Sequence, residues 1–282
     1  MEEERKRQLL WLGMKIREKG LEAVQAAGSG HIGGSFSLAD ILAVLYFDKM
    51  RVDPQNPKDP DRDRFVLSKG HCTPAMYAAL ALKGFFPESE LKNFRSINSN
   101  LSGHVEMTKI PGVDMSAGSL GQGFSAAVGM AVSGKVYHKD YYVYTVIGDG
   151  ELQEGQIWEA FMAAGNYKLD HLIAIIDNNN LQIDGTIEEV MSPYPIDEKL
   201  KAFKWNVLKA DGHDPEQLAN VIDAAKQCKN MPSVIIAKTV KGRGVSFMEN
   251  NPGWHGKTPD AEQYGRAFEE LNKYIVEWEA KL

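Results

Sequence analysis

The sequence predicts an α/β fold, a parallel sheet flanked by helices on both faces, with an N-terminal helical arm over residues 1–27. Strand-like segments alternate with helical ones along the chain, an order typical of parallel sheets. The clearest strand candidates, residues 141–147 and 172–176, are apolar almost throughout, as expected of strands buried on both faces. Neither a repeat of 20 to 50 residues nor a low-complexity linker divides the 282 residues, so one domain is expected.

The individual elements follow from periodicity and from residues that start or stop them. Apolar side chains share one face of a helix over residues 4–27, and the glycine-rich stretch 28–34 is expected to end it. Ser37 is then the expected cap of a second helix at residues 38–48. Further strands are predicted at 65–67, 141–147, 172–176, 205–209 and 234–240, and further helices at 74–83, 123–137, 152–167 and 215–227.

Two stretches between these elements read as loops. The segment at residues 52–64 carries three prolines. Residues 95–123 are irregular and rich in Gly, Ser and Asn. Loops of that length are usually functional, so we expect site residues there.

The composition excludes several classes of protein. Lys and Arg number 32 against 38 Asp and Glu, a net charge of −6, which argues against nucleic acid or an anionic membrane as the main partner. Apolar runs such as residues 41–47 are far shorter than the ~20 residues of a membrane-spanning helix. The acidic N-terminus differs from a signal peptide, and Cys72 and Cys228 form no C-x-x-C motif. A cytoplasmic location with free thiols is therefore expected.

Polar residues follow two of the predicted strands where each strand ends. Gly148-Asp149-Gly150 comes after one, and Asp177-Asn178-Asn179 ends the other; residues 151–177 separate Gly150 from Asn178. That spacing fits one crossover helix and a strand, so Asp149 and Asn179 are expected at neighbouring strand ends, where ligands of open α/β sheets bind. A carboxylate and an amide oxygen suit Mg²⁺. Taken singly, either motif is also compatible with an ordinary turn or loop.

Together the two motifs resemble the thiamine-diphosphate-binding signature, and their surroundings narrow the resemblance to the transketolase family. The resemblance runs over essentially the whole chain, with the motifs in the family's order. The matching segments are GHIGG at 30–34, SKGH at 68–71, GHVE at 103–106, GSLGQG at 118–123, GDGELQEG at 148–155, NNLQIDG at 179–185 and KTVKGRG at 238–244.

The resemblance implies thiamine diphosphate as the cofactor and a divalent cation, Mg²⁺ with Ca²⁺ or Mn²⁺ as substitutes. The implied metal ligands are the side chains of Asp149 and Asn179 and the backbone carbonyl of Leu181. The implied cofactor-binding residues are His71, Gly118, Ser119, Leu120, Asp149, Gly150, Glu151, Asn179, Leu181, Lys241 and His255.

Four histidines match catalytic residues of the family. By resemblance, His71 and His255 lie beside the diphosphate and the reacting centre, and His31 and His104 contact the sugar's hydroxyls and the bound intermediate. Cleaving a ketose moves protons on and off hydroxyl groups near pH 7. Among the side chains, imidazole has the pKa closest to that pH. Of the other histidines, His213 is interpreted as a structural residue, and His138 and His171 as surface residues.

Three further patterns have competing interpretations. Glu154 and Glu159 match family residues at a dimer interface, but they are equally compatible with solvated helix charges. Residues 28–33 fit the G-x-G-x-x-G dinucleotide fingerprint, yet they follow a helix, whereas that fingerprint follows a strand. Zinc is disfavoured because no pair of histidines has the H-x₃-H or H-E-x-x-H spacing.

The chain departs from the family in two respects. Ile32, Ser35 and Val105 stand where prolines are usual, which affects the fine shape of the sugar channel rather than the reaction. The larger departure is that the resemblance covers only the family's first half. The other half supplies the glutamate that protonates the aminopyrimidine ring and the arginines that bind the sugar phosphate.

The resemblance therefore implies that residues 1–282 are the N-terminal, diphosphate-binding subunit of a split transketolase of the pentose phosphate pathway. The implied reaction moves a two-carbon ketol unit from a ketose phosphate to an aldose phosphate. The expected partner is a separate C-terminal subunit, in a dimer of heterodimers, with no nucleic acid or membrane involved. The alternatives are a related enzyme, either deoxyxylulose-phosphate synthase-like or dihydroxyacetone-transferring, and a non-catalytic scaffold that binds Mg²⁺ and diphosphate.

Overall fold

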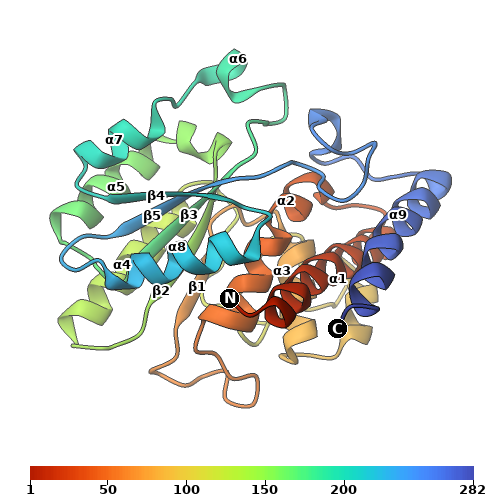
Figure 1. Cartoon of the computed structure of the whole chain (residues 1–282), viewed down its shortest axis with the longest axis horizontal. Helices are drawn as coiled ribbons and strands as arrows, with labels where there is room; N and C mark the ends of the chain where they lie inside the picture. The colour runs from red at the N-terminus through yellow and green to blue at the C-terminus, as the bar shows by residue number, and fades with distance from the viewer.

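A five-stranded parallel sheet forms the centre of the computed structural model, which describes residues 1–282 (Figure 1). The predicted α/β class is confirmed, because every neighbouring pair of strands runs parallel. In spatial order the strands are β1 (Arg64–Leu67), β2 (Val143–Gly148), β3 (Leu172–Asn178), β5 (Ser233–Lys238) and β4 (Asn206–Asp211).

Helices cover both faces of this sheet, as predicted. The α-helices are α1 (Glu3–Ala27), α2 (Ile32–Val44), α3 (Thr73–Lys83), α4 (Gln122–Val136), α5 (Gly155–Asn166), α6 (Ile187–Met191), α7 (Ile196–Ala202), α8 (Pro215–Gln227) and α9 (Ala261–Glu279). Shorter helical turns are η1 (Leu45–Lys49), η2 (Glu88–Asn93), η3 (Gly150–Gln153) and η4 (Pro252–Trp254). None of these helices is long and apolar enough to cross a membrane.

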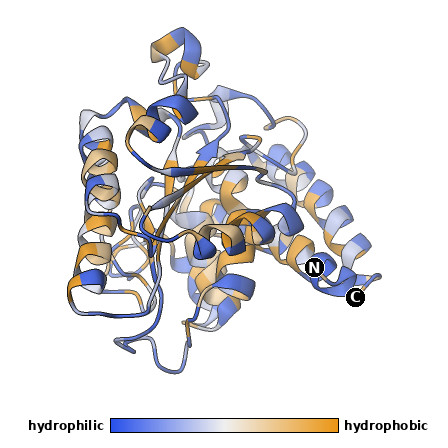
Figure 2. Ribbon diagram, turned by 60° about the vertical axis from the view of Figure 1, so that its left-hand side comes forward, coloured by the Kyte–Doolittle hydropathy of each residue, from blue (hydrophilic) through white to orange (hydrophobic).

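Two hydrophobic cores lie on opposite faces of the sheet because strand side chains alternate between the faces. On β2, Val143 and Ile147 join the core formed with α4, α5 and α7. Tyr144 and Val146 join the larger core formed with α1, α2, α3 and α8. Figure 2 shows the hydrophobic colour running through the central strands, with hydrophilic colour along the outer helix faces.

The second helix begins earlier than the sequence predicts. It starts at Ile32 rather than Leu38, so the predicted start was wrong, whereas the stretch 28–34 does end α1, with Gly28 as its left-handed C-cap. A Cβ at Gly33 would lie 2.9 Å from the Trp254 carbonyl oxygen, and one at Gly34 would lie 2.9 Å from Cys72 Sγ. These glycines permit close packing rather than break the helix. Ser37 is therefore inside α2 and is not its cap.

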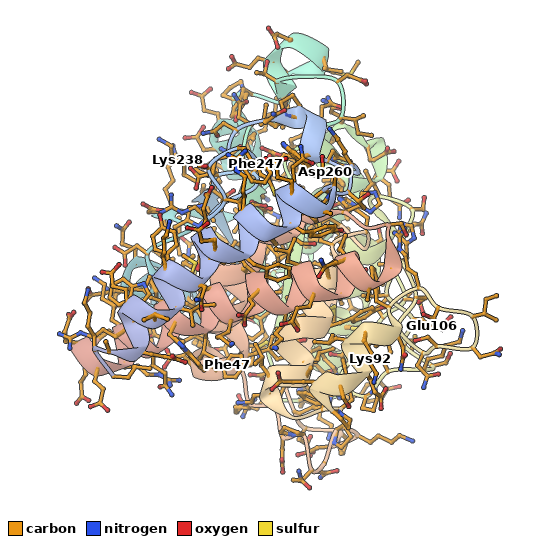
Figure 3. The ribbon with its side chains drawn as sticks, turned by 90° about the vertical axis from the view of Figure 1, so that its right-hand side faces the viewer. Phe47, Lys92, Glu106, Lys238, Phe247 and Asp260 are labelled. Atoms are coloured by element: carbon orange, nitrogen blue, oxygen red, sulfur yellow. The ribbon has the colours of Figure 1, made fainter.

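The C-terminal helix α9 was missed, since no element was predicted after residue 240. Asp260 caps it by accepting a hydrogen bond from the Gln263 amide, and the Gln263 side chain completes a capping box. Buried residues such as Leu271 and Ile275 share one face of α9, which packs along α1 (Figure 3). The glycine-rich stretch at 28–33 lies between α1 and α2, which is not the strand-to-helix position of a dinucleotide fingerprint.

Candidate active site

The two polar motifs meet at the carboxyl edge of the sheet. β2 pairs with β3, and Gly148 is opposite Asp177, so Asp149 and Asn179 follow neighbouring strands as predicted. One Asp149 carboxylate oxygen accepts a hydrogen bond from the Gly150 amide at 2.9 Å, and the other accepts from the Asn180 amide at 2.6 Å. The Asp149 side chain therefore fixes the two strand-end loops relative to each other.

A cavity of about 380 Å³ opens beside these loops and gathers most of the candidate residues. All four candidate histidines line it, although they come from four separate segments of the chain. The candidate residues Leu120, Asp149, Gly150, Glu151, Asn179, Leu181 and Lys241 line it as well. Gly118 and Ser119 are the two candidates that do not, although a Cβ at Gly118 would lie 3.4 Å from the ring of His104, which does.

Three of the histidines form a compact cluster. Ring centroids lie 5.0 Å apart for His31 and His71, 5.4 Å for His31 and His255, and 5.3 Å for His71 and His255. Burial, followed by neighbouring positive charges, lowers the pKa of His31 to about 4 and that of His255 to about 3. Burial and Lys69 lower the pKa of His71 as well. The cluster is therefore neutral at pH 7 and can both donate and accept hydrogen bonds.

His104 approaches the cavity from the long loop between η2 and α4. This loop contains no helix or strand beyond a single bridge between Val105 and Ala117, as the predicted irregular segment requires. α3 holds the loop in place, because Thr73 Oγ1 donates to the Gly103 carbonyl at 3.1 Å and Tyr77 donates to the Ser102 carbonyl at 3.0 Å. Burial and then the charge of Arg95 lower the pKa of His104.

Lys241 links the histidine cluster to the strand-end loops. Its ammonium donates to the Leu181 carbonyl at 3.2 Å and to His255 Nδ1 at 3.0 Å. Burial, reinforced by the charge of Lys69, lowers the Lys241 pKa to about 8. The lysine thus lies next to the carbonyl that the family resemblance assigns to a metal.

A buried ion pair supports the floor of the cavity, and no sequence pattern had indicated it. Lys69 pairs with Asp177, whose carboxylate also accepts hydrogen bonds from Ser37 and Thr239. Although burial opposes it, Lys69 holds the pKa of Asp177 below its usual value. Burial and the nearby Asp177 charge raise the pKa of Asp149 to about 7.

Glu151 lines the cavity, but its carboxylate is turned into the protein. One oxygen accepts from the Ser68 hydroxyl and, at 2.8 Å, from the Gly121 amide; the other accepts from the Gly148 amide at 3.0 Å. Burial raises the pKa of Glu151 in spite of these three donors. Glu151 therefore joins the ends of β1 and β2 to the turn before α4, a role that its place in a motif did not indicate.

The family is decided by comparison with known proteins. The sequence model described as "Transketolase, thiamine diphosphate binding domain" matches residues 12–271. The chain belongs to the transketolase family.

Relatives of similar length are transketolase subunits by name. The chain is 47% identical to "6-deoxy-6-sulfo-D-fructose transketolase subunit SqwG" of Clostridium sp. (strain MSTE9), over 92% of this chain and 94% of that protein. It is 44% identical to an apulose-4-phosphate transketolase subunit of Phocaeicola vulgatus, over 94% of each. A crystal structure of Pichia stipitis transketolase in complex with sedoheptulose 7-phosphate superposes with a TM-score of 0.87 at 30% identity, covering 98% of this chain and 45% of that one.

The residues of this transketolase-family site fit one divalent cation. Asp149 supplies a buried carboxylate whose only hydrogen-bond donors are two backbone amides. Asn179 and Leu181 add an amide and a carbonyl oxygen from the neighbouring strand end. No group of three or more His, Cys, Asp or Glu side chains gathers in metal-binding geometry. One carboxylate with neutral oxygens suits a hard cation that completes its shell with water and phosphate oxygens.

Most of the remaining predicted residues lie outside the cavity, and Glu154, which lines it, is the exception. His213 Nδ1 bonds Asp40 at 2.7 Å and its Nε2 accepts from the Val240 amide at 2.8 Å, a structural arrangement as interpreted. His138 is exposed, whereas His171 is half-buried and stacks on Tyr142 with centroids 4.5 Å apart. Glu154 and Glu159 are both exposed.

Proposed function

We propose that this chain is the diphosphate-binding subunit of a split transketolase. The proposed reaction transfers a two-carbon ketol unit from a ketose phosphate to an aldose phosphate, together with a separate C-terminal subunit. The supporting observation is that relatives named as transketolase subunits match this chain along nearly their whole length, whereas the Pichia enzyme's chain is covered to 45%. Residues 1–282 would then form one N-terminal domain of the complete enzyme.

Asp149, Asn179 and the Leu181 carbonyl would hold Mg²⁺, or Ca²⁺ or Mn²⁺ in its place. Thiamine diphosphate, when bound, supplies the electron sink that stabilises a carbanion. The backbone at Gly118, Ser119, Leu120 and Gly150 would lie along the cofactor, and Lys241 and His71 would face the diphosphate. Glu151 would act on cofactor binding by fixing the turn at Gly121, because its carboxylate is occupied by protein donors.

The four histidines would handle protons and orient the sugar. His31 and His104 would contact its hydroxyl groups, and His255 and His71 would lie closer to the reacting centre. Neutral imidazoles suit this work, because each can accept a proton at one nitrogen while the other donates a hydrogen bond. The lowered pKa values of the buried cluster keep that form available throughout the neutral range.

The assembly would be a dimer of heterodimers in the cytoplasm, serving the pentose phosphate pathway or a related sugar conversion. Glu154 and Glu159 are exposed and free to enter a subunit interface. The relatives act by name on different sugars, a sulfo-sugar and apulose 4-phosphate, so the donor and acceptor must be measured for this chain.

Reconstitution tests the proposal. The purified chain, the C-terminal transketolase chain of the same organism, Mg²⁺ and thiamine diphosphate should together give ketol transfer, and the chain alone should give none. Full activity without a partner would refute the split arrangement. Donor consumption separates a transketolase from the synthase-like and dihydroxyacetone-transferring alternatives. Unchanged turnover of the complex carrying His104→Ala would favour the scaffold alternative.

A further inference from the structure

We propose that Arg95 is a positioning residue that joins the two loops carrying His31 and His104 and so fixes how these imidazoles face the sugar. This inference rests on the proposed function only where its test measures ketol-transfer activity. Arg95 does not line the cavity, and no motif of the sequence contains it.

The backbone of Arg95 has an uncommon conformation that turns its side chain toward the histidine loops. Its φ is +57°, a left-handed value that non-glycine residues adopt only when their surroundings impose it. The Arg95 amide donates to the Leu101 carbonyl at 2.8 Å, closing the loop on itself two residues before Gly103. The strained turn therefore places Arg95 against the segment that leads into His104.

The guanidinium contacts both histidine loops at once. Nη1 donates to Ser29 Oγ at 3.1 Å, two residues before His31. A Cβ on Gly103 would lie only 2.6 Å from Arg95 Nε and 2.8 Å from Cζ, so the guanidinium rests directly on the Gly103 backbone, next to His104. One rigid planar group thus bridges two segments that lie more than 60 residues apart in the sequence.

Arg95 is not an ordinary structural ion pair. It forms no salt bridge with any Asp or Glu, and its Nε is buried without a hydrogen-bond partner. Its guanidinium lies over the Phe94 ring, 5.4 Å from the centroid, and no carboxylate neutralises its charge. After burial, Arg95 is the leading cause of the lowered pKa of both His31 and His104.

The test compares Arg95→Gln, Arg95→Lys and Gly103→Ala with the control Lys92→Gln. Lys92 is an exposed cation on η2, three residues before Arg95, with no side-chain hydrogen bond (Figure 3). Gly103→Ala leaves Arg95 in the sequence but drives its guanidinium off the loop. In the reconstituted complex we expect R95Q and G103A each to lower kcat about tenfold, with the KM for thiamine diphosphate changed less than about twofold. The double variant should lose no more than either single one, because both remove the same contact.

A spectroscopic measurement on the full chain alone separates this inference from the proposed function. In the histidine-labelled chain, R95Q and G103A should shift the imidazole resonances of His31 and His104 and leave those of His213 unchanged. If no partner yields ketol transfer, the proposed function fails, and these resonances still decide the role of Arg95.

Three outcomes would overturn the inference: resonances and kcat of R95Q matching those of K92Q, additive losses in the double variant, or full activity of R95K. Full activity of R95K would mean that charge alone suffices, since a lysine cannot bridge both loops with one planar group. Should R95Q fail to fold, R95K and G103A decide the question by the same measurements.

Discussion

Replacing Lys69 by Met should destabilise the fold far more than removing any surface lysine. Lys69 and Asp177 are almost wholly buried, with side-chain exposures of 3% and 0%. Met has a similar volume, so the variant leaves little empty space but deprives a buried carboxylate of its counter-ion. Two hydroxyl donors, from Ser37 and Thr239, would remain on Asp177.

The expected loss follows from the burial of this pair. Removing one member of a buried ion pair costs about 3–5 kcal/mol, because the other charge is left uncompensated. We expect about 3 kcal/mol at pH 7, since the remaining hydroxyl donors offset part of the cost. With an m-value of about 3 kcal/mol per molar urea, the unfolding midpoint should fall by about 1 M. Lys139→Met, which breaks the exposed pair with Asp61, should cost about 0–1 kcal/mol.

The pH dependence identifies the cause. In the wild-type chain the folded pKa of Asp177 is depressed, so this group stabilises the fold above its unfolded pKa, and that stability is lost as the pH falls through the folded value. In K69M, burial raises the folded pKa of Asp177 instead. The destabilisation should therefore be large at pH 7 and shrink toward pH 5, where the carboxyl group becomes protonated in the folded state.

Urea unfolding followed by circular dichroism at both pH values measures these effects. The double variant K69M with Asp177→Asn should recover most of the stability, because neither charge remains buried alone. A loss below about 1 kcal/mol, a loss that does not change with pH, or a double variant as unstable as K69M would refute the reasoning.

Three other outcomes are expected. Gly123→Ala should destabilise the chain by about 1–3 kcal/mol in urea unfolding, since its Cβ would lie 2.7 Å from Ser68 Cα. Gly129→Ala, with open space around it in α4, should instead stabilise the chain by about 0.5–1 kcal/mol. Equal effects of the two variants would contradict the packing argument. Glu151→Gln should weaken thiamine diphosphate binding in calorimetry by about tenfold, because an amide cannot accept from all three donors; an unchanged affinity would mean that the Gly121 turn holds without it. Mg²⁺ and thiamine diphosphate should each raise the other's affinity by at least about tenfold in the same assay. The diphosphate would offset the Lys241 charge that repels the cation, and the cation would offset the Asp149 charge that repels the diphosphate. Independent binding would contradict this.

The sheet and its site-bearing edge could be predicted because they depend on local patterns. Apolar strands and the polar residues at their ends are visible in the sequence, and the parallel connection rules place Asp149 beside Asn179. The start of α2 could not be predicted, because Gly33 and Gly34 are required by Trp254 and Cys72, which are remote in the sequence. A glycine that permits packing and one that ends a helix look alike in the sequence.

The supporting residues of the site were hidden for a related reason. Lys69, Asp177 and Glu151 lie inside or beside recognisable motifs, but their partners come from other segments of the chain. Arg95 lies in a loop whose path is set by contacts with α3 and Ser29. Charged side chains whose partners are remote in the sequence leave no periodic pattern in it, so only the folded structure shows their contacts. By contrast, α9 had a readable signal in its capping box at Asp260 and Gln263.

The charges around the cavity favour a cation and a diphosphate that bind together over either one alone. A cation held by Asp149 and the Leu181 carbonyl would be repelled by the Lys241 ammonium, which donates to that same carbonyl. A diphosphate near Lys241 would meet the negative charge of the Asp149 carboxylate, which lines the same cavity. Bound together, the cation and the diphosphate would each offset the charge that repels the other. A net charge of −6 could not have indicated this, because the whole-chain count does not show that one carboxylate and one lysine line the same small cavity.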